Sequence, residues 1–439
     1  MADIIVDGTI GAKRFLLLDS TGKIPAVDGS QVTALAAGNI ATDIIPIARI
    51  DVGTTANKLV QLDANAKLPA LDASLLTNIP GATKSANDPA IDTNPSGGVG
   101  SEWHNTTSGE AYICTDATTD ENVWTNVGAG TGDVQPWSFQ GTQYGYCAGG
   151  YNLQSGAHRD EIQKYSFASD GNAIDVGNTL LEQHYRCGAT GTTHGYTMGG
   201  TTGPTNTHGR VEKWPYASDT NSTLVGNLYL ITSGTSSACT AGYIFCASGS
   251  GATGSYDVIC RTATASDADA IDWADTVNMG THNTAGNSST THGYRSQGEG
   301  GVSPHPQSDD IEKYPFASQT NATDVGSLTI ARYSAAAASS TDYGYIVGDT
   351  PNTGENMERI DRFAFASDGN ATDHADNNYR AGTMHGNSST THAYFAGGSE
   401  SGPYTNNISK IAYASTGTAT DVGDLVIGVG YTGATGANY

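Results

Sequence analysis

Three histidines recur at one position of a repeated segment, and histidine is the commonest metal ligand among side chains. They are His194, His292 and His392, each in the pattern Thr-His-(Gly or Ala)-Tyr. The positions taken as equivalent in the other copies are Tyr144, Ala241 and Tyr343. Because a ligand set would not include alanine, we interpret these histidines as packing residues. We expect no metal and no cofactor.

A carboxylate also recurs, directly after a turn rich in Gly and Asn, at Asp175, Asp324, Asp373 and Asp421. Carboxylates and carbonyl groups are the ligands that Ca²⁺ prefers. Leu224 interrupts the series, however, and the spacing is not that of an EF-hand loop. We therefore predict that these carboxylates cap turns.

Enzyme chemistry finds little support in the repeated turn Ser-Asp-Gly-Asn. The turn resembles the Asp-box of sialidase propellers, but its register differs and the tryptophan is missing. A sialidase needs clustered arginines for the substrate carboxylate, and galactose-oxidase chemistry needs a Cys–Tyr crosslink that nothing here brings together. We predict no catalytic residues. A polysaccharide hydrolase, which needs two carboxylates about 5–10 Å apart, stays open as an alternative because the sequence cannot place them.

The composition favours strands and turns and excludes several partners. Of the 439 residues, 56 are glycine and 37% are hydrophobic, and glycine and threonine disfavour long helices. A net charge of −24 repels phosphate, so we expect no nucleic-acid partner. We see no apolar run of about 18 residues and no signal-peptide pattern at the start. We therefore expect that the protein does not insert into a membrane and that it is made in a cytoplasm.

The six cysteines have neither Cys-x-x-Cys spacing nor histidine pairs at zinc spacing. We interpret them as free thiols in strands of a protein made in a reducing compartment. They are Cys114, Cys147, Cys187, Cys239, Cys246 and Cys260.

Two sequence markers repeat about every 50 residues, which indicates a repeat architecture. The first is an Ala-Ser pair, as in "FASDGNAIDVG" (167–177), beginning at Ala168, Ala217, Ala265, Ala317, Ala366 and Ala414. It follows an aromatic residue in every copy except the one at Ala265. The second is a tyrosine ahead of a Gly pair, as in "GYCAGG", at Tyr146, Tyr196 and Tyr394, with more degenerate copies at Tyr243, Tyr294 and Tyr345. Both markers occur six times at this period.

Each repeat can be divided into four short strands. "HGYTMGG" predicts one strand, "VEKWPYAS" alternates at the period of a second, and Ser-Asp-Gly-Asn chemistry predicts a hairpin into a third. Four strands per unit is the spacing of a propeller blade. We predict an all-β fold in which residues 137–439 form a six-bladed β-propeller. The last residues, "TGATGANY" (432–439), resemble the entry into the second unit and should pair with the strand at Tyr146, closing the ring.

The tyrosine and Gly-pair pattern resembles kelch-type propeller repeats. The resemblance covers the whole of 137–439, and the third unit departs most, because "GYIFCASGS" lacks the Gly pair. It implies a kelch-like propeller.

A different repeat occupies residues 1–83. "FLLLDSTGKIPAVDGSQVTAL" (15–35) aligns with "LVQLDANAKLPALDASLLTNI" (59–79). These segments are too short to bury a core alone, so we expect them to associate as a closed homo-oligomer. They resemble the repeats of bacteriophage tail-fibre shafts. Where the shaft pattern usually has Gly, the first copy has Gly22 and the second has Ala66. The resemblance implies an elongated, trimeric shaft that attaches to other virion proteins.

Residues 84–136 resemble small β modules of the same class of fibre proteins. The modules carry a Gly-x-x-Trp-x-Asn strand, then Tyr-x-Cys-x-Asp-Ala-Thr, then a tryptophan. The matching residues are Trp103, Asn105, Tyr112, Cys114, Asp116, Ala117, Thr118 and Trp124.

The order of shaft, small module and propeller implies a phage virion structural protein. The expected function is that of a tail fibre or receptor-binding protein, located on the virion and made in the host cytoplasm, whose distal propeller contacts a host cell-surface glycan or protein. The alternative is a capsid decoration or a tail-tube or collar component that uses the propeller as a rigid module.

Binding residues should lie in the loops that differ between repeats, because variable loops on a rigid scaffold carry function. The variable loops follow the Gly pair, at 151–160, 201–209, 302–310, 349–356 and 399–407. In a four-stranded blade these loops share one face, opposite the hairpins. The candidate binding residues are Tyr151, His158, Arg159, His208, His305 and Tyr404.

Overall fold

The computed structural model describes residues 81–127 and 137–437, except 204–205, 252–253, 279–280, 301–306, 349–357, 400–402 and 432. For 281–282, 297, 300 and 433–437 the backbone alone is described. The two shaft-like repeats lie outside the described residues. The described part is all-β, with strands and no helix, as predicted. Accordingly, it holds no helix with the length and apolarity to cross a bilayer.

The first sheet belongs to the small module and has the order β1-β2-β3-β4. Its strands are β1 (Thr83–Ser85), β2 (Glu102–Asn105), β3 (Ala111–Asp116) and β4 (Val123–Asn126). The chain divides into two units at Lys84–Ser85, within β1. The core of the sheet is small: Tyr112, Cys114 and Trp124 are buried, and Trp103 packs edge-on against Trp124 at 5.9 Å. These aromatic residues of the motif therefore serve the fold.

The polar residues of the same motif hold turns. The side-chain oxygen of Asn105 accepts hydrogen bonds from the N–H groups of Thr107 and Ser108. Asp116 accepts from both the N–H and the hydroxyl of Thr118. Both arrangements are Asx turns, which stabilise loops without any ligand.

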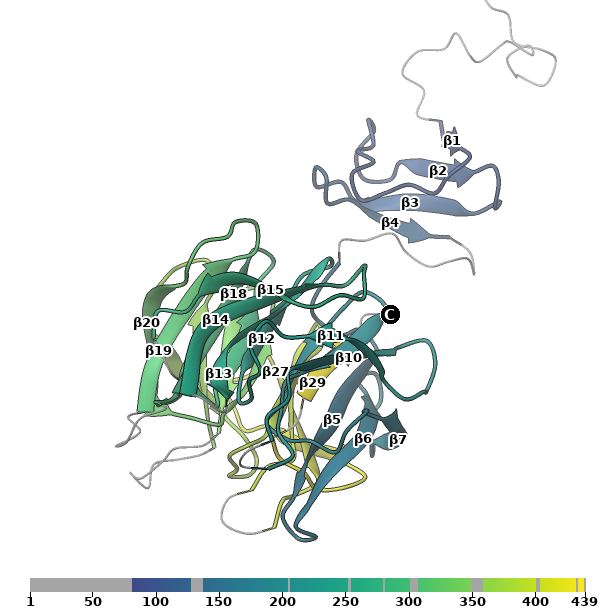
Figure 1. Cartoon of the computed structure of the whole chain (residues 1–439). Helices are drawn as coiled ribbons and strands as arrows, with labels where there is room; N and C mark the ends of the chain where they lie inside the picture. The colour runs from purple at the N-terminus through teal and green to yellow at the C-terminus, as the bar shows by residue number, and fades with distance from the viewer. Residues whose placement is uncertain are drawn as a thin grey trace, which may run out of the picture. The chain divides into compact units, whose positions relative to one another are not determined.

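Six further sheets follow, each built on four antiparallel strands (Figure 1). The first combines β29 (Gly433–Ala437), β5 (Tyr144–Asn152), β6 (Ala157–Ser166) and β7 (Ile174–Asn178). The second is β8 (Cys187–Thr190), β9 (His194–Met198), β10 (Arg210–Pro215) and β11 (Thr223–Asn227). The third is β12 (Ser236–Cys239), β13 (Tyr243–Gly251), β14 (Gly254–Ala263) and β15 (Ile271–Asp275).

The fourth sheet is β17 (Ala285–Ser288), β18 (His292–Gly300), β19 (Gln307–Pro315) and β20 (Thr323–Arg332), with β16 (Thr281–His282) also beside β18. The fifth is β21 (Ala336–Ser339), β22 (Tyr343–Val347), β23 (Arg359–Ala364) and β24 (Thr372–Asp376). The sixth is β25 (His385–Ser388), β26 (His392–Ala396), β27 (Asn407–Ala412) and β28 (Thr420–Asp424). The repeated turn joins the third and fourth strands of each sheet, as predicted.

The pairing predicted for the last residues is confirmed. Strand β29 is antiparallel to β5, with Thr435 opposite Tyr146. The first sheet is therefore completed by residues from the opposite end of the chain.

The first strands of the six sheets lie against one another in order. Strand β8 contacts β12, and the contacts continue through β17, β21 and β25 to β29, which contacts β8 again. The approach is close: a Cβ added at Gly286 would collide with the carbonyl oxygen of Ser237, and one at Gly386 with that of Ala337. Glycine is required where backbones pass this closely.

Two cyclic sets of backbone hydrogen bonds join the six sheets. In the inner set, each residue donates its N–H to the carbonyl of the member before it, at 2.6–3.0 Å, and the first donates to the last. All members have left-handed backbone, with φ between 56° and 68°. The members are Tyr185, Gly234, Asn283, Ser334, Thr383 and Tyr431. We call these six residues the inner ring.

The outer set ties each repeated turn to the fourth strand of the preceding sheet, at 2.7–2.9 Å. The donors are the N–H groups of Ala173, Ser222, Ala270, Ala322, Ala371 and Ala419. Ala173 donates to Asp424, so this set also joins the sixth sheet to the first.

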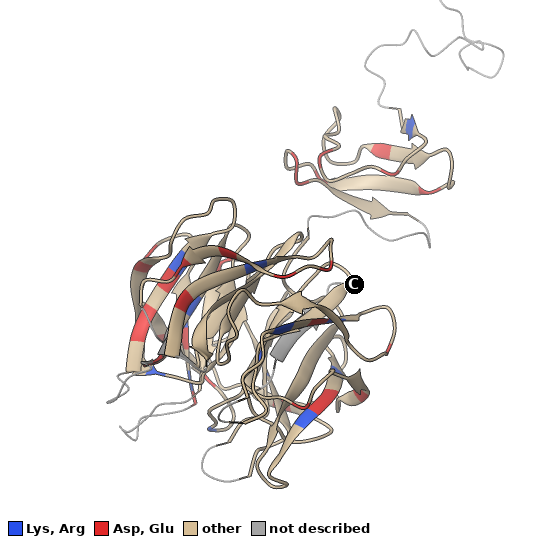
Figure 2. Ribbon diagram, in the orientation of Figure 1, with Lys and Arg blue, Asp and Glu red and all other residues tan. Residues whose placement is uncertain are grey.

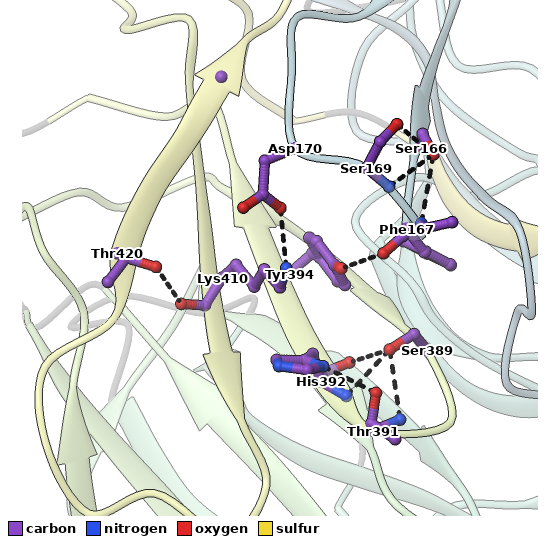
Figure 3. A network of polar contacts seen from close by, with 12 residues as sticks. Ser166, Phe167, Ser169, Asp170, Ser389, Thr391, His392, Tyr394, Lys410 and Thr420 are labelled. Atoms are coloured by element: carbon purple, nitrogen blue, oxygen red, sulfur yellow. Dashed lines mark hydrogen bonds and ion pairs between the residues drawn. The ribbon is translucent and has the colours of Figure 1, made fainter.

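The two sequence markers meet at the junctions between sheets. In five of the six junctions, the ring at the tyrosine marker packs on the aromatic residue before the Ala-Ser pair of the next sheet, with centroids 4.6–5.5 Å apart. Figure 3 shows the junction between the sixth and first sheets, where the hydroxyl of Tyr394 also donates to the carbonyl of Phe167 at 3.2 Å. At the remaining junction, Tyr196 donates to Thr264.

The marker in the third unit was assigned two residues too early. Strand register places Phe245 opposite Arg261, as Tyr196 lies opposite Lys213. Phe245, not Tyr243, is therefore the packing residue, and it stacks on Phe316 at 4.9 Å. By the same register the equivalent of His194 is Tyr243, not Ala241. The argument against a metal that rested on alanine was therefore wrong.

The three recurring histidines are nevertheless used locally. Each ring Nδ1 lies 2.7–2.8 Å from the hydroxyl of the preceding threonine, as Figure 3 shows for His392 and Thr391. In the described part of the chain, no group of three or more His, Cys, Asp or Glu side chains could hold a metal ion.

Side chains of the repeated turn bind the preceding sheet. Lys410 pairs with Asp170 at 2.8 Å across the junction drawn in Figure 3. Equivalent lysine–aspartate pairs occur at three other junctions, through Asp219, Asp267 and Asp368. The turn asparagines accept from backbone N–H groups of the preceding sheet, as Asn221 does from Asn178. The predicted capping is found at Asp175, Asp324 and Asp421, each of which accepts from the glycine N–H two residues on. The fourth aspartate of the series, Asp373, pairs with Arg359 at 3.4 Å.

Three arginine–carboxylate pairs are buried inside the sheets. Their side chains are at most 1% exposed, and their N–O distances are 2.5–2.7 Å. The carboxylates also accept backbone N–H groups; Glu212 accepts that of Leu180, for example. The pairs are Arg186–Glu212, Arg295–Glu312 and Arg332–Asp361.

All six cysteines are free, buried and in strands, as predicted. The Sγ atoms of Cys187 and Cys246 lie 3.7 Å apart.

Candidate binding site

Each sheet has two distinct ends. In the second sheet, Met198 of β9 lies opposite Val211 of β10 beside the variable loop, whereas His194 lies opposite Pro215 beside the repeated turn. We call these the loop end and the hairpin end. The inner ring is at the loop end, because each member directly precedes the first strand of a sheet. The predicted separation of variable loops from hairpins is therefore found within the sheets.

Six aromatic rings gather at the loop end where the first sheet meets its neighbours. Ring centroids lie 5.3 Å apart for Tyr151 and His158, 4.7 Å for His158 and His184, and 4.1 Å for Tyr185 and Tyr431. Tyr404 stands edge-on to both Tyr151 and Tyr431 at 6.4 Å. All six side chains are half-buried. We call Tyr151, His158, His184, Tyr185, Tyr404 and Tyr431 the aromatic cluster.

Backbone pairing holds the cluster in place. Tyr151, at the end of β5, exchanges two hydrogen bonds with Gly430, which precedes Tyr431. His184 exchanges two with Thr201, and its Nδ1 lies 3.1 Å from the Thr201 carbonyl oxygen. Gly430 gives Tyr404 its room, because a Cβ there would lie 2.8 Å from a ring carbon of Tyr404. The rings are therefore supported by main chain from three different sheets.

The structure brings together three of the six predicted binding residues. Tyr151, His158 and Tyr404 belong to the cluster. Arg159 follows His158, but its guanidinium is paired with Glu161. His208 lies in the second sheet, where its N–H donates to the carbonyl of Gly200. His305 lies outside the described residues. All six assignments stay predictions.

The sequence analysis missed His184, Tyr185 and Tyr431 because it searched only the loops after the Gly pair. The connections between consecutive sheets open at the same end. The sequence did contain a signal for the two tyrosines. "YRCGATG" (185–191) and "YTGATG" (431–436) are similar, and each places a tyrosine two residues before the first strand of a sheet.

Burial favours the uncharged form of three rings of the cluster. It lowers the pKa of His184 to about 4, with a smaller contribution from His158. It raises the pKa of Tyr404 to about 12, against a hydrogen bond with Thr383. The pKa of Tyr185 is also raised by burial, and its hydrogen bond with Tyr431 opposes this. These three rings therefore do not attract a ligand by charge at neutral pH.

Buried polar atoms beside the cluster lack partners. The Nδ1 of His158 and both side-chain amide atoms of Gln183 make no hydrogen bond to the protein. Buried polar groups normally have a partner, either protein, water or ligand. These atoms can therefore receive a polar ligand or ordered water.

A cavity of about 170 Å³ runs between the first strands and begins at the inner ring. Its lining includes the ring residues Tyr185 and Tyr431, which are also cluster residues, and the buried His385. Phe139 lines it as well. The neighbouring Gln140 and Gly141 bond to the carbonyls of Ser339 and Ser388, at the hairpin ends of β21 and β25. The cluster thus borders one end of an internal cavity.

Comparison with known proteins identifies no relative: no family model matches the chain, and no curated protein matches its sequence.

Proposed function

We propose that residues 137–439 form a six-bladed, kelch-like β-propeller whose blades are the six sheets. The proposal is supported by the inner and outer sets of hydrogen bonds, which each pass through six sheets and return to the first. It is also supported by the order of contacts among the first strands, from β8 to β29 and back to β8. A closed ring leaves no unpaired sheet to associate with other chains.

We further propose that the chain is a phage virion structural protein, acting as a tail fibre or receptor-binding protein. In this proposal, residues 1–83 form a trimeric shaft that attaches to other virion proteins. The small module links the shaft to the propeller, which contacts a host cell-surface glycan or protein. The motifs of the shaft and the small module support the assignment to a virion.

One observation carries the binding role. The hairpin ends repeat the same contacts from sheet to sheet, whereas the loop ends differ, and one of them carries six half-buried aromatic rings with unpartnered polar atoms beside them. Binding sites are typically built from aromatic walls and a few polar groups. Three copies of such a site on one fibre would raise avidity without any new contact.

The first experiment is the solution mass, by light scattering, of the full-length protein and of a fragment beginning at Trp137. We expect a trimer for the full chain and a monomer that unfolds cooperatively for the fragment. A monomeric full chain would contradict the shaft proposal. A capsid decoration or collar component, ordered by another virion protein, would then be the better assignment.

The hydrolase alternative has one candidate group at the same loop end. Burial raises the pKa of Asp160, and Glu161 and Glu182 contribute to the increase. Glu161 is paired with Arg159, however, and Asp160 accepts a hydrogen bond from Asn178 at 3.2 Å. A glycosidase needs one free acid and one free carboxylate, so these contacts favour binding over hydrolysis. Reducing ends released from host polysaccharide, and lost in Asp160→Asn, would reverse that preference.

A further inference from the structure

Among the residues that the structure describes, the aromatic cluster occurs once, whereas most other contacts repeat from sheet to sheet. At the positions equivalent to Tyr151, the described sheets carry Thr201, Ser250, Glu299 and Ser399. The inner-ring positions of Tyr185 and Tyr431 are occupied elsewhere by Gly234, Asn283, Ser334 and Thr383. The same backbone bonds form with these small residues. Closing the ring therefore does not require aromatic side chains, and the cluster needs another explanation.

The chemistry of the cluster suits a sugar. Tyrosine and histidine rings offer flat apolar faces for the C–H faces of a pyranose, together with polar edges that reach its hydroxyls. Rings that stand at different angles can contact more than one sugar unit: Tyr404 is edge-on to Tyr151, whereas His158 and His184 are inclined by 36°. The unpartnered Nδ1 of His158 provides a hydrogen-bonding group at the same place.

The surrounding charge argues for a neutral sugar. Two arginines at this end of the molecule are already paired: Arg159 is held by Glu161, and Arg186 is buried against Glu212. Asp160 and Glu182 add negative charge to this end of the first sheet. Figure 2 shows acidic residues distributed along the ribbon of the described sheets, and the chain has 44 acidic against 20 basic residues. An acidic sugar would need a free cation and would meet repulsion here.

We infer that the aromatic cluster is a binding site for a neutral surface glycan, with Tyr151 and Tyr404 as stacking residues. The inference rests on the proposed receptor-binding function and names its ligand class and place. The backbone bonds at Gly430 and Thr201 pre-form the site, which lowers the entropic cost of binding.

The test uses fluorescent full-length protein and a panel of bacterial strains, and it measures attachment at subsaturating concentration. We expect periodate oxidation of the cells, which cleaves sugar diols, to abolish attachment. We expect protease treatment and amidation of surface carboxylates to leave it unchanged. Tyr151→Ala and Tyr404→Ala should each reduce attachment about three- to tenfold, the loss typical of one aromatic contact. Tyr151→Phe should retain most of it.

The matched control is Tyr229→Ala, which removes a tyrosine that is 53% exposed at the loop end of another sheet. It should attach like the unmodified protein, and all variants should keep its thermal midpoint. If attachment stays periodate-sensitive but Tyr151→Ala and Tyr404→Ala do not weaken it, the receptor function holds and this site is wrong. Sensitivity to protease, or to amidation, would replace the neutral glycan by a protein or an acidic sugar. Attachment to no strain would count against both the site and the receptor function.

Discussion

The hairpin end and the loop end of the six sheets are built on opposite principles. At the hairpin end, the same contacts recur from junction to junction: an aromatic stack, a backbone hydrogen bond from the turn and, at four junctions, a lysine–aspartate pair. At the loop end, backbone hydrogen bonds such as those of the inner ring recur, whereas the side chains of the loops differ. A contact that recurs from junction to junction holds neighbouring sheets together. A feature that is found at a single junction of the described sheets, such as the aromatic cluster, is not needed for that and is available for binding.

This difference predicts that stability depends on the repeated contacts and the interior, whereas substitutions at the loop end change binding. Four changes test it, beginning with the largest expected effect.

Removing residues 431–439 should be the most damaging change. It deletes β29, leaves one edge of β5 without its partner strand and removes Tyr431 from the inner ring. We expect the free energy of unfolding to fall by on the order of 5 kcal/mol or more, measured by urea unfolding of the full-length background. The control starts the chain at Trp137 instead, which keeps all six sheets. Equal stability of both shortened chains would mean that closure contributes little.

Glu212→Ala should come next, because it leaves the Arg186 guanidinium buried without its carboxylate. An uncompensated buried charge costs about 3–5 kcal/mol. The loop-end counterpart, Glu161→Ala, breaks a pair whose side chains are 26% and 15% exposed. We expect a loss of about 1 kcal/mol or less there. Similar losses in urea unfolding for the two variants would remove the contrast between interior and loop end.

Acid should destabilise the interior through His385, which is buried and has no hydrogen-bond partner on either ring nitrogen. Burial lowers its pKa to about 3. Above pH 6.5, the histidine is neutral in both the folded and the unfolded chain. As pH falls from 6.5 toward 3, only the unfolded chain takes up the proton. The free energy of unfolding therefore falls by on the order of 1.4 kcal/mol per pH unit from this group.

His385→Gln should flatten that slope in urea unfolding measured between pH 7.5 and 4.5. His392→Gln, at the hairpin end, should flatten it less, because burial also lowers the pKa of His392 but this side chain is only partly buried. If the two substitutions change the slope equally, burial of His385 is not what makes the protein acid-sensitive.

The smallest effect is expected at the lysine–aspartate pairs. Lys410→Ala removes the pair with Asp170, whose side chain is 54% exposed. Such a pair contributes roughly 0.2–1 kcal/mol and is screened by salt. Lys213→Ala, at another junction, is the matched change. A much larger loss at Lys410 than at Lys213 would show that the junction between the sixth and first sheets is weaker than the others.

Much of the fold could be predicted because each repeat must make the same contacts with its neighbour. The turn at 167–177 was predicted as a hairpin from its Asp, Gly and Asn residues, and the closing pair of β29 and β5 from its likeness to the second unit. The third unit was misaligned because Phe245 stands where the other copies have tyrosine, so the nearby Tyr243 was taken instead. Stacking needs only a flat ring, which either residue supplies.

Only half of the aromatic cluster was predicted from the sequence. Tyr151, His158 and Tyr404 were selected because their loops vary, and they do lie together. His184 and Tyr431 were missed, because the search was confined to the loops after the Gly pair and these residues lie in the connections between consecutive sheets. The buried pair of Arg186 and Glu212 was also missed.

By itself the sequence determined the class of fold, the period, the turn and the partner of the last strand, since these follow from local pattern and repetition. The tertiary structure alone decided that Tyr151 and Tyr431, more than half the chain apart, share one aromatic cluster. Pairing of β29 with β5 places the two ends of the repeat array side by side. Residues that no repeat relates become neighbours only when that pairing forms.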